Sequence, residues 1–404
     1  MSVLSGQRAR IAQLLLVFIA FISLGLPDGL LGVAWPSIRH SFAKPLDALG
    51  ILLLAFTSGY LTSSFLSGYA MTRIGVGWLL AVSCAATGIS LLAYTLVGHW
   101  GLLVAFAVLT GLGAGAIDGG INTYVASHFG ERWMHWLHAS WGIGITLGPL
   151  IMTASLEQFQ TWRWGYVVVG IAQIALGAFF ILTLAQWNQD RGPAHAQEQK
   201  RLTDFQTPLQ DTLRHTRVWF SILLFFVFSG AEATAGIWAF TLLKESRGLA
   251  TQEAGLLTAA YWATFTLGRI LAGLYTFRLG GPVLIRICLF GMFVGALLLG
   301  WNPSPWIGLA GLIMTGFFVS PVFPGLVSGT SDRVGRRDAA NTIGIQIGAA
   351  GVGAAALPGL AGVIAQRYSM EVIPFYLAAL VLLALALHIS TRKLAGSPSR
   401  VETG

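Results

Sequence analysis

Three acidic residues, Asp28, Asp118 and Glu232, lie inside long apolar stretches of the chain. A charged side chain at the centre of a bilayer costs roughly 2.5–3.5 kcal/mol, so three facing lipid would cost on the order of 8–10 kcal/mol, comparable to the stability of a whole domain. Each must therefore border water, pair with a cation or carry a proton. Because burial disfavours the charged form of a carboxyl group, these residues are suited to proton exchange. A neutral acid bonded to a backbone carbonyl is the structural alternative.

The neighbours of two of these acids add to their chemistry. Pro27 precedes Asp28 in a glycine-rich stretch, which predicts a distorted or broken helix beside that carboxylate. Asp118 and Asn122 are four residues apart, so they share one face of a helix. Their acceptors and donors suit a hydroxylated solute or a chain of water molecules.

Further candidates for a substrate site are polar or aromatic residues that lie deep in apolar stretches. Most of the 14 Trp residues lie near the ends of such stretches, where they are expected to anchor helices at the membrane interface. For the deeper Trp residues, stacking on a sugar and simple helix packing both remain open. A buried amide often only bridges two helices. The candidates are His138, Trp141, Trp238, Tyr261, Trp262 and Gln346.

The elements that must position these residues are membrane-spanning helices. Of the 404 residues, 55% are hydrophobic and only 10% are charged, against about a quarter charged in soluble proteins. Water-soluble folds are thereby excluded, and long unbroken apolar runs disfavour a transmembrane β-barrel. The sequence predicts an all-α membrane protein with twelve transmembrane helices, at about 11–36, 46–70, 77–98, 100–127, 133–157, 163–187, 217–243, 252–277, 282–301, 304–328, 339–365 and 371–391.

The distribution of positive charge predicts the orientation. With a cytoplasmic N-terminus, seventeen of the 24 Lys and Arg residues fall on the cytoplasmic side and six on the other, while Arg269 lies within the eighth span. Both termini are therefore expected in the cytoplasm, with the protein in the cell membrane and in contact with the lipid bilayer. Because the positive charges lie between spans, the net charge of +8 does not indicate a nucleic-acid partner.

An internal repeat divides the chain into two halves. The polar stretch 188–216 is predicted to be a cytoplasmic linker between an N-terminal six-helix bundle (1–187) and a C-terminal bundle with a short tail (217–404). An offset of 204 takes Asp28 to Glu232. An offset of 205 relates the loops after the second and eighth spans, through Gly68, Arg73, Gly75, Gly273, Arg278 and Gly280.

Two six-helix halves related in this way resemble the major facilitator superfamily. The element that begins at Gly68 is similar to the loop signature of that family, although Thr72 stands where an Asp is usual. The resemblance implies that the two repeated loops help to gate the cytoplasmic side. A tight turn with one Arg that sets topology is the simpler interpretation.

A narrower resemblance rests on Asp28 with Leu30 and Leu31, and on Asp118-x-x-x-Asn122-x-x-Val125. These residues resemble the fucose:proton symporter family, a branch that also includes sodium-dependent glucose transporters. The resemblance implies proton coupling and sugar binding by Asp28 and Asp118. In the fifth helix that family often has an Asn where this chain has Ala139, and His138 is the candidate to replace it.

The expected function is therefore secondary transport of a sugar or related hydroxylated compound by a monomer that works by alternating access. Protons are the expected driving ion, with sodium as the alternative. The runner-up is a proton-driven exporter of amphipathic molecules, because Gly144-x-x-x-Gly148-Pro149 partly resembles a signature of such exporters. A membrane enzyme or a sensor is the remaining alternative. Enzyme activity is not expected, because the polar residues within the spans lack a nucleophile–base pair or metal-ligand spacing. No Walker element appears, which argues against direct drive by ATP. Cys84 and Cys288 are too few for a metal site, so neither cofactor nor metal is expected.

Overall fold

The computed structural model describes residues 2–129, 131–188 and 207–395, within which the side chains of 2–11, 126–127, 131–132, 135, 273–279 and 392–395 are left out of the description. Every regular element in these residues is a helix. The chain forms two compact units: Met1–His195 with Ala239–Thr266, and Ala196–Trp238 with Leu267–Gly404. Each unit is described by itself.

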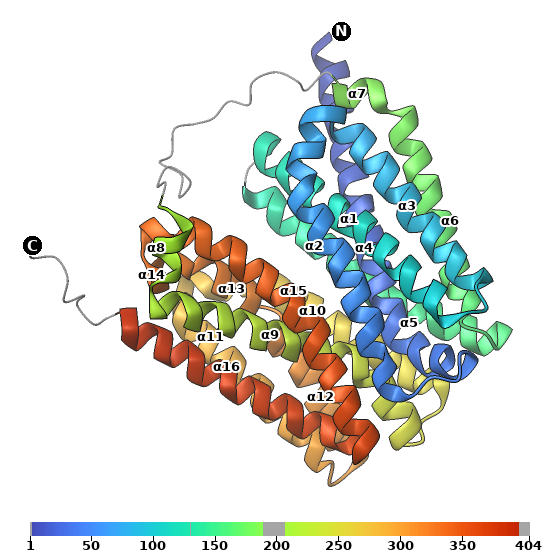
Figure 1. Ribbon diagram of the computed structural model, residues 1–404, viewed down its shortest axis with the longest axis vertical. Coiled ribbons are helices and arrows are strands. Elements are labelled where there is room, and N and C mark those ends of the chain that lie inside the picture. The colour runs from blue at the N-terminus through green and yellow to red at the C-terminus, as the bar shows by residue number, and fades with distance from the viewer. Residues whose placement is uncertain (1, 130, 189–206, 396–404) are drawn as a thin grey trace, which may run out of the picture. The chain divides into compact units, whose positions relative to one another are not determined.

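The N-terminal part of the first unit, as far as Asn188, has six long helices and two short ones among the described residues. Within it α1 packs against α5, α2 against α4, and α3 against both α4 and α6 (Figure 1). Its apolar core is formed by side chains from α1, α3, α4, α5 and α6. The helices are α1 (Ser2–Ser41), the short η1 (Leu46–Ala48), α2 (Leu49–Ile74), α3 (Val76–Leu96), α4 (Trp100–His128), α5 (Glu131–Phe159), α6 (Arg163–Leu182) and α7 (Leu184–Asn188).

The second half of the chain repeats this order. There α11 packs against α12 and α16, as α3 packs against α4 and α6. Two of its helices cross the boundary between units, because residues 239–266 belong to the first unit. The helices are α8 (Leu209–Leu213), α9 (Thr216–Thr241), the π-helical η3 (Leu242–Ser246), α10 (Thr251–Leu279), α11 (Gly281–Trp301), α12 (Pro305–Val319), α13 (Val322–Ser328), α14 (Thr330–Val334), α15 (Arg336–Arg367), η4 (Met370–Val372) and α16 (Ile373–Ala395).

All twelve expected spans are found as helices in the described residues. Eleven are long and apolar enough to cross a membrane, and α10 is equally long but more polar. The tenth span differs from the prediction of one helix, because it breaks at Ser320–Pro321 into α12 and α13. Pro321 has no N–H to continue the helical bonding, and the hydroxyl of Ser320 donates instead to the carbonyl oxygen of Phe317 at 3.3 Å.

The distortion expected beside Asp28 does not break the helix. Helix α1 continues through Pro27 without interruption. Pro27 cannot donate to the carbonyl oxygen of Ser23, four residues earlier. The side chain of Gln173, on α6, donates to that oxygen through Nε2 at 2.8 Å, and Gln173 is fully buried. A tertiary hydrogen bond thus replaces the missing helical one and fixes α1 next to Asp28.

We expect Gln173→Leu to lower the free energy of unfolding by about 1–3 kcal/mol, because the carbonyl oxygen of Ser23 would remain buried without a donor. Gln158→Leu, at an exposed position near the end of α5, is the matched control and should change stability by less than about 0.5 kcal/mol. Chemical unfolding of the purified protein measures both. Equal stability of the two variants would contradict this role for Gln173.

Glycines allow α1 and α5 to approach closely. A Cβ atom on Gly144 would lie 2.0 Å from the carbonyl oxygen of Ile22. The second half repeats this approach between α9 and α15, where a Cβ atom on Gly353 would lie 2.0 Å from the carbonyl oxygen of Phe226. No side chain larger than hydrogen fits at either position without moving a backbone. The glycine motif of the fifth span is therefore used for packing against the first span.

The two repeated loops share one backbone turn. Gly75 ends α2 with a φ of 81°, and Gly280 precedes α11 with a φ of 73°, a region that favours glycine. Arg73 is exposed and lies over the ring of Tyr69. Gly68 is exposed and has open space around it. The remaining predicted loop residues, Gly273 and Arg278, lie outside the residues whose side chains are described.

Candidate functional site

Asp118 on α4 accepts hydrogen bonds at both carboxylate oxygens. The hydroxyl of Tyr60, on α2, donates to Oδ2 at 2.6 Å, and the amide of Asn122 donates to Oδ1 at 2.8 Å. The predicted pairing of Asp118 with Asn122 on one helix face is present. Tyr60 was not predicted, although the many hydroxyl side chains around it in the second span were a signal that could have found it.

Glycines on α4 bring Tyr60 to Asp118. A Cβ atom on Gly115 would lie 2.1 Å from the carbonyl oxygen of Tyr60, and one on Gly119 would lie 2.4 Å from the hydroxyl of Ser67. Only glycine permits α2 to come this close. The short bond between the phenol and the carboxylate follows from this approach.

Asp28 has different surroundings. Its side chain is exposed, and among the described residues one donor, Nε1 of Trp141 on α5, reaches its Oδ2 atom at 3.3 Å. Trp141 lies edge-on to Trp262 and Phe265, with ring centroids 6.5 and 6.0 Å apart. Asp28, on α1, therefore borders an aromatic cluster built from α5 and α10.

The two acids of the first unit form one electrostatic cluster. Asp28 interacts electrostatically with Asp118 and with Tyr60. Two like charges in one site disfavour simultaneous ionisation. Asp118 keeps both of its donors in this arrangement.

Two other predicted residues of the first unit have aromatic contacts. His138 lies edge-on to Phe21 with ring centroids 5.7 Å apart. Tyr261 is fully buried and lies 5.0 Å, centroid to centroid, from Trp262. Trp141 thus contacts both Asp28 and Trp262, and Tyr261 contacts Trp262.

Glu232, in the second unit, lies near a cation. Nη2 of Arg269 on α10 is 4.0 Å from Oε1 of Glu232 on α9, and the side chains are 18% and 17% exposed. At this separation the two groups form an ion pair, but the distance is too long for a hydrogen bond. Arg269 was recognised as the one basic residue within a span, but its pairing with Glu232 was not predicted.

Trp238 and Gln346 use their polar atoms inside the second unit. Nε1 of Trp238 donates to the carbonyl oxygen of Pro358 at 3.0 Å. The buried amide of Gln346 donates to Ser221 at 2.7 Å and accepts from Thr330 at 3.0 Å. Both residues therefore connect helices, and their predicted role in substrate binding stays a prediction.

The described residues contain no group of three or more His, Cys, Asp or Glu that could hold a metal ion. Cys84 and Cys288 are buried free thiols. The polar chemistry of the site lies in its carboxylates, hydroxyls and amides.

Comparisons with known proteins point to one family. A family model described as the Major Facilitator Superfamily matches residues 16–281 and 222–402. Sodium-dependent glucose transporter 1 of Homo sapiens is 23% identical over 392 residues, covering 86% of this chain and 73% of the relative. The glucose/mannose transporter GlcP of Bacillus subtilis is 19% identical over 310 residues, covering 75% of this chain and 76% of the relative.

Solved structures share the fold. The nucleoside transporter NupG superposes with a TM-score of 0.76 at 14% identity, covering 93% of this chain and 98% of the other. The E. coli fucose:proton symporter FucP gives a TM-score of 0.64 at 14% identity, covering 94% of this chain and 98% of the other. At such low identity these similarities concern the fold alone.

Proposed function

This chain belongs to the Major Facilitator Superfamily, and we propose that it is a secondary active transporter that moves a sugar or related hydroxylated solute by alternating access, coupled to protons. The relatives named as glucose and glucose/mannose transporters support a sugar as the solute. We place it in the cell membrane with both termini in the cytoplasm, as the charge distribution predicts.

The observation that carries the proposal is the difference between the two acids of the first unit. Asp118 has a donor on each oxygen, so its carboxylate form is satisfied. Asp28 is exposed and has one long hydrogen bond. Acids in such unequal surroundings take unequal roles. In our proposal Asp28 loads and releases the proton, and Asp118 receives hydroxyl groups of the solute in place of Tyr60.

The aromatic cluster supports the choice of solute. Trp141 and Trp262 offer apolar faces beside a carboxylate, which suits the C–H face and the hydroxyl groups of a sugar ring. Asn122, His138 and Tyr261 would supply further polar contacts. Glu232 would contribute to coupling through its pair with Arg269.

The segment 239–266 supports alternating access. It belongs to the first unit, where Nη2 of Arg39 contacts both carboxylate oxygens of Glu245 at 2.7 and 2.8 Å. The hydroxyls of Thr146 and Thr266 lie 3.4 Å apart in the same unit. In our proposal these contacts close the outer side and break when it opens.

The proposal predicts uptake into proteoliposomes that an imposed inward proton gradient drives. For one proton per solute, each unit of pH difference supports up to about tenfold accumulation. A panel of hexoses, deoxyhexoses and nucleosides should contain a solute that accumulates. An inward sodium gradient without a pH difference should give equilibration only.

The same measurement separates this function from the exporter. An exporter that exchanges its substrate for protons would show uptake that an inward proton gradient opposes, with amphipathic molecules rather than sugars as substrates. If no hydroxylated solute enters under either gradient, the proposed function is wrong.

A further inference from the structure

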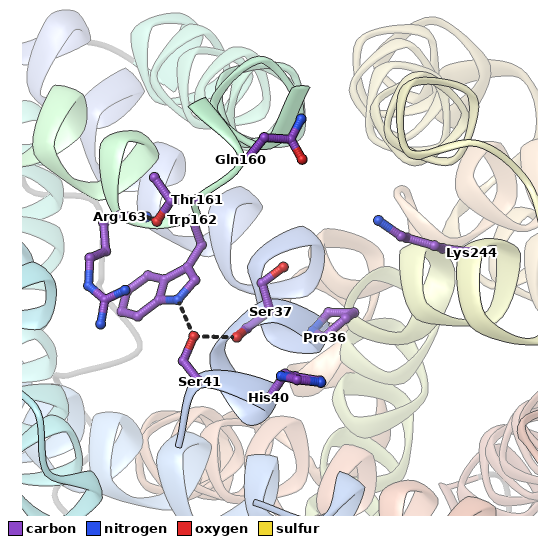
Figure 2. Close-up of a pocket in the computed structure, with 9 residues that line it drawn as sticks. All are labelled: Pro36, Ser37, His40, Ser41, Gln160, Thr161, Trp162, Arg163 and Lys244. Carbon is purple, nitrogen blue, oxygen red and sulfur yellow. Dashed lines mark hydrogen bonds between the residues drawn. The ribbon is translucent and has the colours of Figure 1, made fainter. Parts of the chain in front are cut away.

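A pocket of about 380 Å³ lies in the first unit, and neither Asp28 nor Asp118 lines it. Three segments form it: the C-terminal end of α1, the connection between α5 and α6, and η3 after α9. Figure 2 shows side chains from all three segments surrounding one space. Its lining residues are Pro36, Ser37, His40, Ser41, Gln160, Thr161, Trp162, Arg163 and Lys244.

Three of the lining side chains can carry positive charge, and their own contacts leave that charge uncompensated. Lys244 donates to the hydroxyl of Thr251 at 2.6 Å and lies 5.7 Å from the centroid of the Phe240 ring, and neither contact is to an anion. Arg163 stacks on the ring of Trp162 and donates to the carbonyl oxygen of Thr95. The ring of His40 has no hydrogen bond with the residues that the structure describes.

Acidic residues do not balance these cations. Within the described chain, no Asp or Glu lines the pocket, and no carboxylate pairs with His40, Arg163 or Lys244. Glu245, next to Lys244, is already bound by both of its oxygens to Arg39. The pocket therefore keeps a positive potential, which a concave site concentrates.

The rest of the lining suits a small polar ligand. Figure 2 shows Lys244 extending toward the space in front of Ser37, with Gln160 on another side. Ser41 accepts from Nε1 of Trp162 at 3.0 Å and donates to the carbonyl oxygen of Ser37 at 2.8 Å, which fixes the wall. The volume falls within the range of small-molecule sites.

We propose that this pocket binds a small oxyanion, such as phosphate, sulfate or an organic carboxylate, from the solution on the side opposite the cytoplasm. Lys244 supplies the principal charge-assisted hydrogen bond. The bound anion connects α1, the α5–α6 connection and η3, and so stabilises the conformation in which Arg39 contacts Glu245. The pocket is thus a regulatory site, separate from the solute site of the proposed transporter.

The test uses the full-length purified protein and sulfate as the probe. Isothermal titration in detergent should show sulfate binding to the wild type, and Lys244→Met should weaken it about tenfold or more, as loss of one charge-assisted bond predicts. Lys44→Met is the matched control: Lys44 lies just after α1 but does not line the pocket. It should bind sulfate as the wild type does. Unchanged thermal stability of Lys244→Met would show that the variant is folded.

Sidedness and ligand source are tested in proteoliposomes. External sulfate should slow solute uptake by the wild type and leave the uptake by Lys244→Met unchanged, whereas sulfate on the cytoplasmic side should have no effect. The proposal is wrong if the wild type does not bind sulfate, or if Lys244→Met binds it equally well. A different result would assign the pocket to the phosphate of a lipid: anionic phospholipid displaces sulfate, and sulfate has no effect on uptake in membranes that contain this phospholipid. That result would overturn the proposal of a ligand from solution. None of these binding results depends on the transported solute.

Discussion

Asp28→Asn will abolish proton-driven accumulation of the solute while preserving its exchange across the membrane. Asparagine has nearly the same shape as aspartic acid and can still accept from Nε1 of Trp141, whose donor lies 3.3 Å from the carboxylate. It cannot take up or release a proton, so the solute and proton movements become uncoupled. With a one-unit pH difference, the accumulation ratio should fall from up to about ten to about one.

Two comparisons make this result specific. Asp47→Asn, in the short helix η1 at the very start of the second span, should accumulate solute as the wild type does. Asp118→Asn should instead weaken solute binding, because asparagine keeps one acceptor oxygen in place of the two that now accept from Tyr60 and Asn122, and it carries no charge. Counterflow with labelled solute separates exchange from net uptake. Full accumulation by Asp28→Asn would remove the proton-loading role.

Arg269→Gln is expected to produce the largest loss of stability. It leaves the carboxylate of Glu232 in an apolar bundle without its cation, and removal of one partner of a buried ion pair costs about 3–5 kcal/mol. Because the two side chains are 18% and 17% exposed and the contact is 4.0 Å long, we expect about 3 kcal/mol. Thermal or chemical unfolding of the purified protein measures the difference.

The double variant Glu232→Gln/Arg269→Gln tests whether the loss comes from the pair. Two neutral amides of similar shape leave no unpaired charge, so the double variant should be more stable than Arg269→Gln alone. Additive losses would mean that the two residues act independently. Transport by the double variant then reports what Glu232 contributes to coupling, since its fold is restored.

The ion pair between Arg39 and Glu245, which our proposal places on the outer side, lies next to the proposed oxyanion pocket. Arg39 and His40 are neighbours on α1, and Glu245 and Lys244 are neighbours in η3. Arg39 and Glu245, one residue from each pair of neighbours, form the ion pair, and His40 and Lys244 line the pocket. An anion that binds Lys244 therefore acts on the same two segments that the ion pair holds together.

The sequence by itself determined the helices and the acids. Long apolar runs can satisfy their backbone hydrogen bonds in a bilayer only as helices, so the spans could be predicted without knowledge of their contacts. The free-energy cost of placing a carboxylate in the apolar bilayer identified Asp28, Asp118 and Glu232 in the same way. Spacing on one helix predicted the contact between Asp118 and Asn122, because a helix fixes which residues share a face.

Only the tertiary structure decided which side chains from different helices meet. Tyr60, Gln173 and Arg269 reach Asp118, Ser23 and Glu232 across helix boundaries, and no spacing along one helix encodes such contacts. The effect of Pro27 was misjudged for the same reason, since the donor that keeps α1 continuous comes from α6. The contact of Tyr60 with Asp118, for example, requires the close approach of α2 to the glycines of α4, and that approach depends on how the helices pack together.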